Sequence, residues 1–348
     1  MIIKSIDLKE YRNYHRLHVE LDSKMNIIIG TNGIGKTNIL ESLTVVSNTK
    51  SFRTNDDQEL IHNNEEYARI EVNVDNTIYR VIINKSGKAL FINQTAIKRS
   101  SDFIGKLNVV LFEPSDLELF AASPRTRRRL IDLELGKTSK DYLNALLVYN
   151  KLIKEKNNLL KNEKIDELLL ETINERLVAP ISKIIRYRQA FIDYINQYIS
   201  EYFKKISNTE FNIRIDYKKA VESDELAIKE MLRHNIQKDI LYRCSTVGPH
   251  KDDIIFYFDE HLIVNYASQG QKRMTMVAFK LALIQYIIAK TKTTPVLLLD
   301  DILSELDLLN KERMLNMIPP GVQTIITSTD VNGIKLKDEY RLFNLKKG

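Results

Sequence analysis

The chain of 348 residues is 43% hydrophobic and 28% charged. This composition excludes a disordered polar polypeptide, and no uninterrupted apolar run approaches the roughly 18 residues of a membrane helix. The 52 basic and 46 acidic residues leave a formal net charge of +6, which suits a nucleic-acid partner and an ordinary solvated surface alike. Because Cys244 is the single cysteine, a disulfide framework and a multi-cysteine zinc site are excluded, and we expect a cytoplasmic protein of about two domain-sized units.

The first third of the chain is rich in strand patterns. Residues 1–7 alternate between apolar and polar side chains, as do Leu17, Val19 and Leu21 with their neighbours. Together with segments 67–74, 77–84 and 89–93, they predict an antiparallel layer. Four other short runs are apolar on both faces, which is typical of central strands in a sheet covered by helices on both sides. These runs are residues 26–29, 109–112, 295–299 and 324–327.

The segment Gly30–Thr37, here called the phosphate loop, directly follows the first of these apolar strands. Its sequence Gly-Thr-Asn-Gly-Ile-Gly-Lys-Thr matches the nucleotide-binding pattern G-x-x-x-x-G-K-[ST] in the strand–loop–helix setting that the pattern requires. The glycines let backbone N–H groups turn toward phosphates, and the following helix points its positive end at them. We expect Lys36 to reach the β- and γ-phosphates and the Thr37 hydroxyl to ligate Mg²⁺. The expected nucleotide-binding residues here are Gly30, Thr31, Asn32, Gly33, Ile34, Gly35, Lys36, Thr37 and Asn38.

A cluster of arginines precedes the middle of the chain. It consists of Arg125, Arg127, Arg128 and Arg129. Such a cluster could contact DNA phosphates and give salt-dependent, sequence-independent affinity. Solvated charges and intramolecular ion pairs remain an equal alternative.

The middle of the chain predicts a helical insertion. No glycine lies between Gly136 and Gly248, and a stretch so poor in helix breakers should be mostly helical. Its apolar residues recur at three- and four-residue steps, as in an antiparallel helical hairpin or bundle, although Lys156 and Arg188 interrupt the pattern. We therefore expect a discontinuous α/β domain of residues 1–120 and 245–348, with a helical arm of residues 121–244 between its parts.

Two further motifs follow the insertion. Ser268-Gln269-Gly270-Gln271, here called the signature motif, opens an amphipathic helix and resembles the signature loop of ABC-type ATPases, which contacts the γ-phosphate held by the opposite subunit. The alternative is a simply capped helix, because Ser268 is a good N-cap. The apolar strand 295–299 then ends in Asp300 and Asp301. In a phosphate-loop protein, Asp300 would hold Mg²⁺ and Asp301 would orient or deprotonate the attacking water, so Lys36 and Asp301 are the expected catalytic residues.

Several sequence blocks resemble those of the RecF family of bacterial DNA recombination and repair ATPases. They occur in the family's order over nearly the whole chain: residues 8–14 (LKEYRNY), 35–41 (GKTNILE), 50–53 (KSFR), 112–117 (FEPSDL), 123–129, 248–253 (GPHKDD), 268–273 (SQGQKR) and 299–307 (LDDILSELD).

The resemblance implies a fold and a function. The fold would be an ABC-type, Rad50/SMC-like phosphate-loop ATPase head with a short helical arm. ATP and Mg²⁺ would drive homodimerisation, with each nucleotide between the phosphate loop of one subunit and the signature motif of the other, residues 304–307 crossing the interface, and Arg12 and Asn13 near base and ribose. The resemblance further implies a weak, DNA-stimulated ATPase that binds gaps and single-strand–duplex junctions and helps load RecA with RecO and RecR, without a membrane partner.

Four positions depart from the family pattern: Ile34, Glu113, Lys272 and the pair Thr329-Asp330, which occupies the possible γ-phosphate-sensing position. Two rival functions also remain. One is a nucleotide-gated scaffold for repair partners whose hydrolysis is dispensable, and the other is a transporter ATPase subunit, which the helical insertion and the lack of a membrane segment disfavour.

Overall fold

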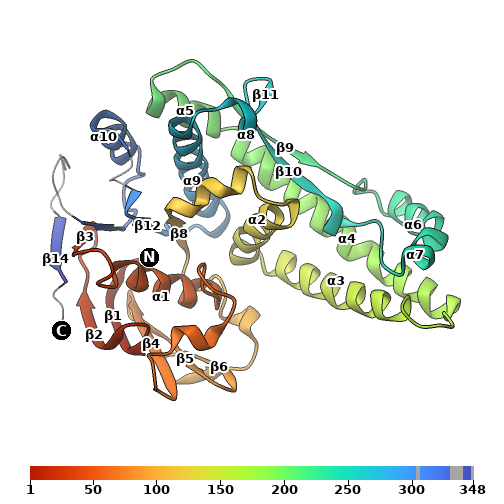
Figure 1. The fold of residues 1–348 in the computed structure, drawn as a ribbon, viewed down its shortest axis with the longest axis horizontal. Coiled ribbons are helices and arrows are strands. Elements are labelled where there is room, and N and C mark those ends of the chain that lie inside the picture. Colours follow the sequence, from red (N-terminus) through yellow and green to blue (C-terminus); the bar gives the residue numbers. More distant parts are fainter. Residues whose placement is uncertain (303–305, 330–339, 346–348) are drawn as a thin grey trace. The chain divides into compact units, whose positions relative to one another are not determined.

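The computed structural model describes residues 1–302, 306–329 and 340–345 (Figure 1). The chain divides into two compact units. Unit 1 comprises residues 1–117, 201–210 and 268–348, and unit 2 comprises residues 118–200 and 211–267. The domain boundaries expected from the sequence stay a prediction. This division differs from them, because it groups residues 245–267 with unit 2 and residues 201–210 with unit 1.

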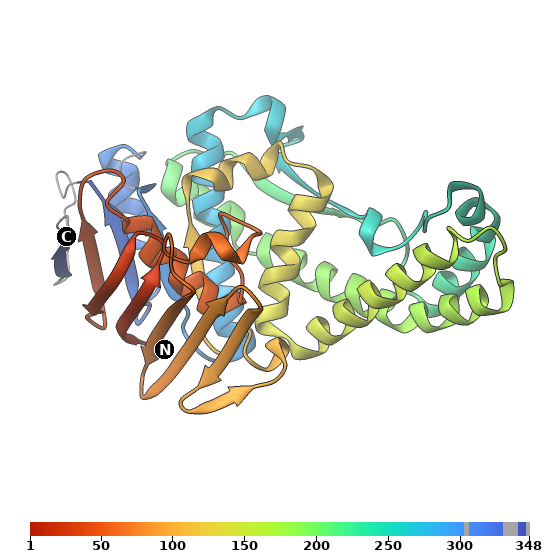
Figure 2. The same ribbon diagram turned by 60° about the horizontal axis from the view of Figure 1, so that its bottom comes forward.

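Unit 1 contains a six-stranded antiparallel sheet in the order β2-β1-β4-β5-β6-β7 (Figure 2). Strand β4 shows the alternating burial expected of a sheet with one face on the core. The strands expected in this region are all present. Their bounds are β1 (Ile3–Tyr11), β2 (Tyr14–Glu20), β4 (Tyr67–Val74), β5 (Thr77–Asn84), β6 (Gly87–Ile92) and β7 (Thr95–Ile97), with short 3₁₀ helices η1 (Asp57–Leu60) and η2 (Ser100–Asp102).

A second sheet of unit 1 is parallel and has the order β14-β3-β13-β12-β8. Its strands are β3 (Met25–Ile29), β8 (Val109–Phe112), β12 (Val296–Asp300), β13 (Thr324–Ser328) and β14 (Tyr340–Asn344). Helix α1 (Lys36–Asn48) contacts strands of both sheets, so one apolar core joins the two layers. Helix α9 (Gln269–Thr291) contacts β8, and α10 (Leu308–Asn316) joins β12 to β13.

Helix α9 is the one helix among the described residues that is long and apolar enough to cross a membrane. Two-thirds of its apolar window, 67%, is buried inside the protein. Core helices of soluble proteins meet the same length and composition test, so this helix gives weak evidence for a membrane span.

Unit 2 is mostly helical, as the absence of glycine predicts, and its helices α3 and α4 pack against each other (Figure 1). The helices assigned to this region are α2 (Pro124–Thr138), α3 (Lys140–Leu159), α4 (Glu167–Asn196), α6 (Glu225–His234), α7 (Ile236–Tyr242) and α8 (Ile263–Tyr266), with the 3₁₀ helices η3 (Pro114–Phe120) and η4 (Pro249–Lys251) and helix α5 (Ile199–Ser207) at its borders. Unit 2 also holds a three-stranded antiparallel sheet, β11-β10-β9, whose strand β9 was not expected inside the glycine-free stretch. Its strands are β9 (Ile213–Lys218), β10 (Asp253–Phe258) and β11 (His261–Leu262).

Both polar interruptions of the predicted apolar pattern are buried cations with partners. Lys156 lies on α3 and its Nζ is 2.7 Å from Oδ2 of Asp239, with both side chains fully buried. Arg188 on α4 contacts Asp132 and Asp252, with N–O distances of 2.9 and 3.0 Å. A buried charge is tolerated when an opposite charge pairs with it. The interruptions are therefore part of the unit 2 core and not breaks in its helices.

His250, in η4 of unit 2, is held as a neutral imidazole. Its Nε2 lies 3.1 Å from the carbonyl oxygen of Ser245, which can only accept, so Nε2 carries the proton and the Tyr149 hydroxyl donates to Nδ1. Burial lowers the pKa of His250 to about 4, and the charges of Lys251 and Arg128 act in the same direction. The ordinary pKa of a histidine is 6.5, so folding excludes a proton here.

The low pKa of His250 predicts an acid-sensitive unit 2. Since the folded-state pKa lies below the unfolded value, its contribution to stability is complete above pH 6.5 and is lost progressively toward pH 4. The loss should be about 1.4 kcal/mol per pH unit in that window. The free energy of unfolding, measured with urea at pH 7, 5.5 and 4.5, should depend less steeply on pH for His250→Gln than for the wild type. If the unfolding free energies of the two proteins changed equally with pH, the low pKa of His250 would be contradicted. Asp252, whose pKa is raised by burial, titrates in both proteins and cancels in the difference.

Candidate nucleotide site

The phosphate loop connects β3 to α1 in the conformation that its glycines permit. Gly33 and Gly35 have φ values of 81° and 113°, and Gly35 is the N-cap of α1. Residues other than glycine rarely adopt such backbone angles. The buried Lys36 folds back over the loop, and its Nζ donates to the carbonyl oxygens of Gly30 at 2.8 Å and Thr31 at 3.4 Å. The structure thus forms a closed loop at a helix N-terminus, with the Lys36 ammonium group inside it. Such a loop can bind phosphates.

Asp300 lies beside the start of α1 although 263 residues separate it from Thr37. The Thr37 hydroxyl donates to Oδ1 of Asp300 at 3.0 Å, and the Thr327 hydroxyl donates to the same oxygen at 2.7 Å. Burial raises the pKa of Asp300, while these two hydrogen bonds act against the rise. A hydroxyl and a carboxylate oxygen at this separation fit Mg²⁺, which prefers hard oxygen ligands. The residues expected to bind the metal are therefore adjacent.

Asp301 follows at the carboxyl end of β12 with a φ of 50°, a left-handed conformation that is rare outside glycine, asparagine and aspartate. Its backbone N–H donates to both the carbonyl and the hydroxyl oxygen of Thr327, at 3.2 and 3.1 Å. Glu113 follows the neighbouring strand β8. Burial, together with the charge of Asp116, raises the pKa of Glu113 to about 7. The carboxyl ends of the neighbouring strands β12 and β8 therefore gather several acidic groups at one sheet edge.

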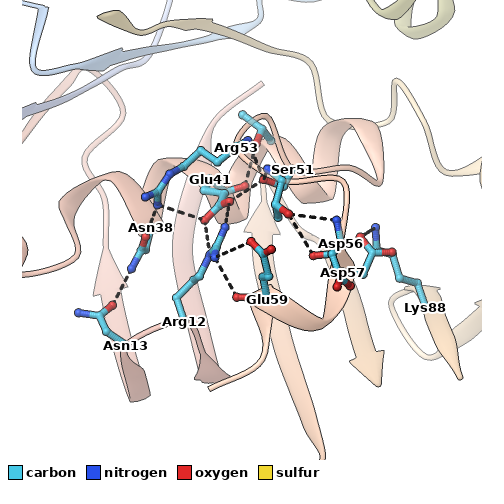
Figure 3. Close-up of polar contacts among 12 residues, drawn as sticks. Arg12, Asn13, Asn38, Glu41, Ser51, Arg53, Asp56, Asp57, Glu59 and Lys88 are labelled. Atoms are coloured by element: carbon cyan, nitrogen blue, oxygen red, sulfur yellow. Dashed lines mark hydrogen bonds and ion pairs between the residues drawn. The ribbon is translucent and has the colours of Figure 1, made fainter. Parts of the chain in front are cut away.

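The turn between β1 and β2 packs on the phosphate loop, and it packs on α1 as Figure 3 shows. The guanidinium of Arg12 donates from Nε and Nη2 to the two carboxylate oxygens of Glu41, at 2.9 and 2.6 Å. Burial lowers the pKa of Arg12, but the hydrogen bond and charge of Glu41 outweigh it and raise the pKa. Glu41 also accepts from the Ser51 hydroxyl at 2.5 Å. One buried carboxylate therefore joins the turn, the helix α1 and the segment after it.

The signature motif forms the N-terminus of α9. Ser268 and Gln271 make a capping box, in which the Ser268 hydroxyl accepts from the Gln271 backbone and the Gln271 side chain accepts from the Ser268 backbone. Ser268, Gln269 and Gly270 are exposed. A Cβ added to Gly270 would meet only the Ser268 hydroxyl, at 4.0 Å. No other residue in the described part of the chain crowds this position, so the surface here is open to the approach of another molecule.

The arginine cluster on α2 is divided between inward and outward side chains. Arg127 makes two hydrogen bonds to Asp253, at 2.9 and 2.8 Å, and Arg128 donates to the backbone carbonyl of Asp252. Arg125 and Arg129 are exposed. The structure therefore favours intramolecular pairing for Arg127 and Arg128, and DNA contact by any of the four stays a prediction.

Some expected site residues lie outside the described residues, and some site residues were not expected. Residues 304, 305 and 330 belong to the first group, whereas Thr329 is described and is exposed at the end of β13. Thr327 and Glu41 belong to the second. Glu41 carries a sequence signal in retrospect, because it is the one carboxylate within the buried stretch 39–47 of α1. Thr327 carries no such sequence signal, because only the strand order brings it next to Asp300 and Asp301.

The fold and the site define the class of protein. A parallel sheet with a phosphate loop and a carboxylate strand, an added antiparallel layer, a signature helix and an inserted helical unit together make an ABC-type, SMC-like ATPase head. In agreement, residues 2–346 match the family RecF/RecN/SMC N terminal domain. The chain is 38% identical to the DNA replication and repair protein RecF of Bacillus mycoides (strain KBAB4), over 96% of this chain and 94% of the relative. It is also 38% identical to RecF of Bacillus cereus (strain G9842), over 97% and 95%. The chain belongs to the RecF family.

Solved structures confirm the expected fold class. The structure of the recombination mediator protein RecF with ATP, in the RecFOR pathway, superposes with a TM-score of 0.88 at 30% identity and covers 96% of this chain and 93% of that one. The Smc head bound to the C-terminal winged-helix domain of ScpA has a TM-score of 0.55 at 18% identity, covering 95% and 90%. The second match shows a shared fold alone.

Proposed function

We propose that this protein is an ATP-dependent DNA-binding protein of recombinational repair and replication. The observation that carries the proposal is the Thr37–Asp300 contact at the mouth of the phosphate loop, which brings together the two distant motifs expected to hold a magnesium-bound triphosphate. Family membership supports the same function, since the relatives are DNA replication and repair proteins and a related structure contains ATP.

Each group of residues has a separate role in a slow ATPase. Backbone N–H groups of the phosphate loop and the Lys36 ammonium bind the phosphates, and Thr37 and Asp300 would hold Mg²⁺. When bound, Mg²⁺ neutralises negative charge on the phosphates. Asp301 orients the attacking water and accepts its proton. Arg12 and Asn13, in the β1–β2 turn beside the phosphate loop, would lie near the base and ribose.

Completion of the site requires a second copy of the chain. The exposed signature motif, with open space at Gly270, is available to a nucleotide held by a partner subunit. In the proposed cycle, ATP joins two subunits and hydrolysis separates them. The dimer would bind DNA gaps and single-strand–duplex junctions and, with RecO and RecR, help load RecA, and DNA would stimulate the weak hydrolysis.

The test measures self-association, and binding to gapped against intact duplex DNA, with and without ATP. For the wild type, ATP should promote dimerisation and tighten binding to gapped DNA, and Lys36→Ala should remove both effects. Asp301→Asn should keep both effects while turnover is abolished. Equal behaviour of all proteins with and without ATP would disprove the proposal. If Asp301→Asn still supports gap repair in cells, the alternative of a nucleotide-gated scaffold with dispensable hydrolysis is favoured.

A further inference from the structure

A chain of side-chain hydrogen bonds, whose members Arg53, Asn38 and Asn13 are drawn in Figure 3, ends on the phosphate loop. Nη1 of Arg53 donates to Oδ1 of Asn38 at 2.8 Å, and Nδ2 of Asn38 donates to Oδ1 of Asn13 at 2.7 Å. Nδ2 of Asn13 then donates to the backbone carbonyl of Ile34 at 2.8 Å. Three segments that are separate in sequence thus act on a single peptide group of the loop.

The two ends of this chain determine the direction of every bond in it. A guanidinium can only donate, so the oxygen of the Asn38 amide must face Arg53 and its nitrogen must face Asn13. The carbonyl of Ile34 can only accept, so the nitrogen of the Asn13 amide must face it. Both asparagine orientations are therefore fixed by the chemistry of the ends, and the bonds polarise one another in the same sense.

The last bond orients the peptide group between Ile34 and Gly35. This peptide is trans, and in a planar trans peptide the C=O and the N–H point in opposite directions. Because Asn13 holds the Ile34 carbonyl toward the β1–β2 turn, the Gly35 N–H points away from that turn. We propose that Asn13 is a positioning residue that holds the 34–35 peptide with its N–H directed at a bound phosphate, and that Asn38 and Arg53 act through Asn13.

Two further observations support this role. The turn that carries Asn13 is held in place by two contacts, since the backbone N–H of Arg12 donates to the carbonyl of Leu60 and the Arg12 side chain donates to Glu41. Asn13 also approaches the loop so closely that a Cβ at Gly35 would lie 2.7 Å from its amide atoms. A fixed donor at this distance leaves the peptide little freedom to rotate.

This inference rests on the proposed nucleotide binding and differs from a direct contact of Asn13 with the nucleoside. A positioning residue affects the phosphates, so its loss weakens every ligand that carries them. A residue that touches base or ribose affects only ligands that have a nucleoside. Inorganic tripolyphosphate, which has the phosphates and no nucleoside, separates the two.

The experiment measures the Kd of the full chain for ATP and for inorganic tripolyphosphate, both with Mg²⁺, by titration calorimetry. Asn13→Ala should raise both Kd values by the same factor, about 10-fold, as expected for the loss of one hydrogen bond. Asn76→Ala is the matched control, because Asn76 is an exposed residue of another turn in the same sheet that accepts from Lys4. It should change neither Kd by more than about 2-fold.

Asn38→Ala supplies an independent variant and a double-mutant cycle. Alone it should raise both Kd values by about 3-fold, and in the Asn13→Ala background it should add nothing, because its effect passes through Asn13. Three results would overturn the inference: a loss of affinity confined to ATP, an unchanged Kd in Asn13→Ala, or additive losses of affinity in the double variant. Wild-type protein that binds neither ligand would instead overturn the proposed function, and this inference with it.

Discussion

Replacing Gly35 by alanine should reduce ATP affinity by at least about 100-fold. The φ of 113° at this position is strained for any residue with a Cβ, at a cost of about 1–3 kcal/mol. The new methyl group would also lie 2.6 Å from the Tyr14 hydroxyl and 2.7 Å from the Asn13 amide. The loop or the two side chains packed on it must therefore shift, and about 2.7 kcal/mol of lost binding energy corresponds to the 100-fold change. Titration calorimetry with ATP and Mg²⁺ measures it.

Gly87→Ala is the control for backbone strain without the collision. Gly87 has a φ of 131° in the hairpin between β5 and β6, and an added Cβ there meets nothing within 4 Å. This variant should lose stability and retain wild-type ATP affinity. If Gly35→Ala bound ATP within about 3-fold of the wild type, the close packing of the β1–β2 turn on the phosphate loop would not matter for binding.

Replacing Arg188 by methionine should destabilise unit 2 by about 3–5 kcal/mol, the usual cost of removing one partner from a buried ion pair. The Arg188 side chain is 3% exposed and contacts the carboxylates of Asp132 and Asp252 and the backbone carbonyl of Pro249. Methionine fills a similar volume but leaves two carboxylates without their cation, one of them fully buried. Urea unfolding followed by circular dichroism, whose signal is dominated by helices, measures the loss.

Lys183→Met on the same helix is the matched control. Lys183 pairs with Asp141 at 2.7 Å, but both side chains are about half exposed, at 51% and 53%. Exposed pairs contribute little because solvent screens them, so this variant should unfold at nearly the wild-type urea concentration. Similar midpoints for the two variants would show that the Arg188 cluster is not a stabilising part of the core.

The phosphate loop could be predicted from sequence because its chemistry is local. Eight consecutive residues contain the glycines, the lysine and the hydroxyl, and the preceding strand and following helix are equally local. Asp300 could be predicted for a related reason, since parallel strands present their carboxyl ends at one sheet edge. The contact between Thr37 and Asp300 joins these two elements across the sheet edge.

The partners of buried polar groups could not be predicted. Lys156 and Arg188 are visible in the sequence as gaps in an apolar pattern, but the carboxylates that pair with them, Asp239 and Asp252, come from distant segments. Hydrophobic periodicity assigns a face to a residue and says nothing about which segment packs on that face. Strand β9 was missed because low glycine content favoured helix, although Ile213, Ile215 and Tyr217 alternate with charged residues.

The strand order places β13 between the strand that leads into the phosphate loop and the strand that ends in Asp300. Neighbouring strands are about 4.8 Å apart, so β13 separates the backbones of β3 and β12 by about 10 Å. The end of β13 thus lies between the ends of these two strands, and its residues Thr327 and Ser328 are both buried. A larger side chain at either buried position would have to displace its neighbours. Residues 327 and 328, which no nucleotide motif includes, should therefore tolerate far less variation in size than the exposed loops around them.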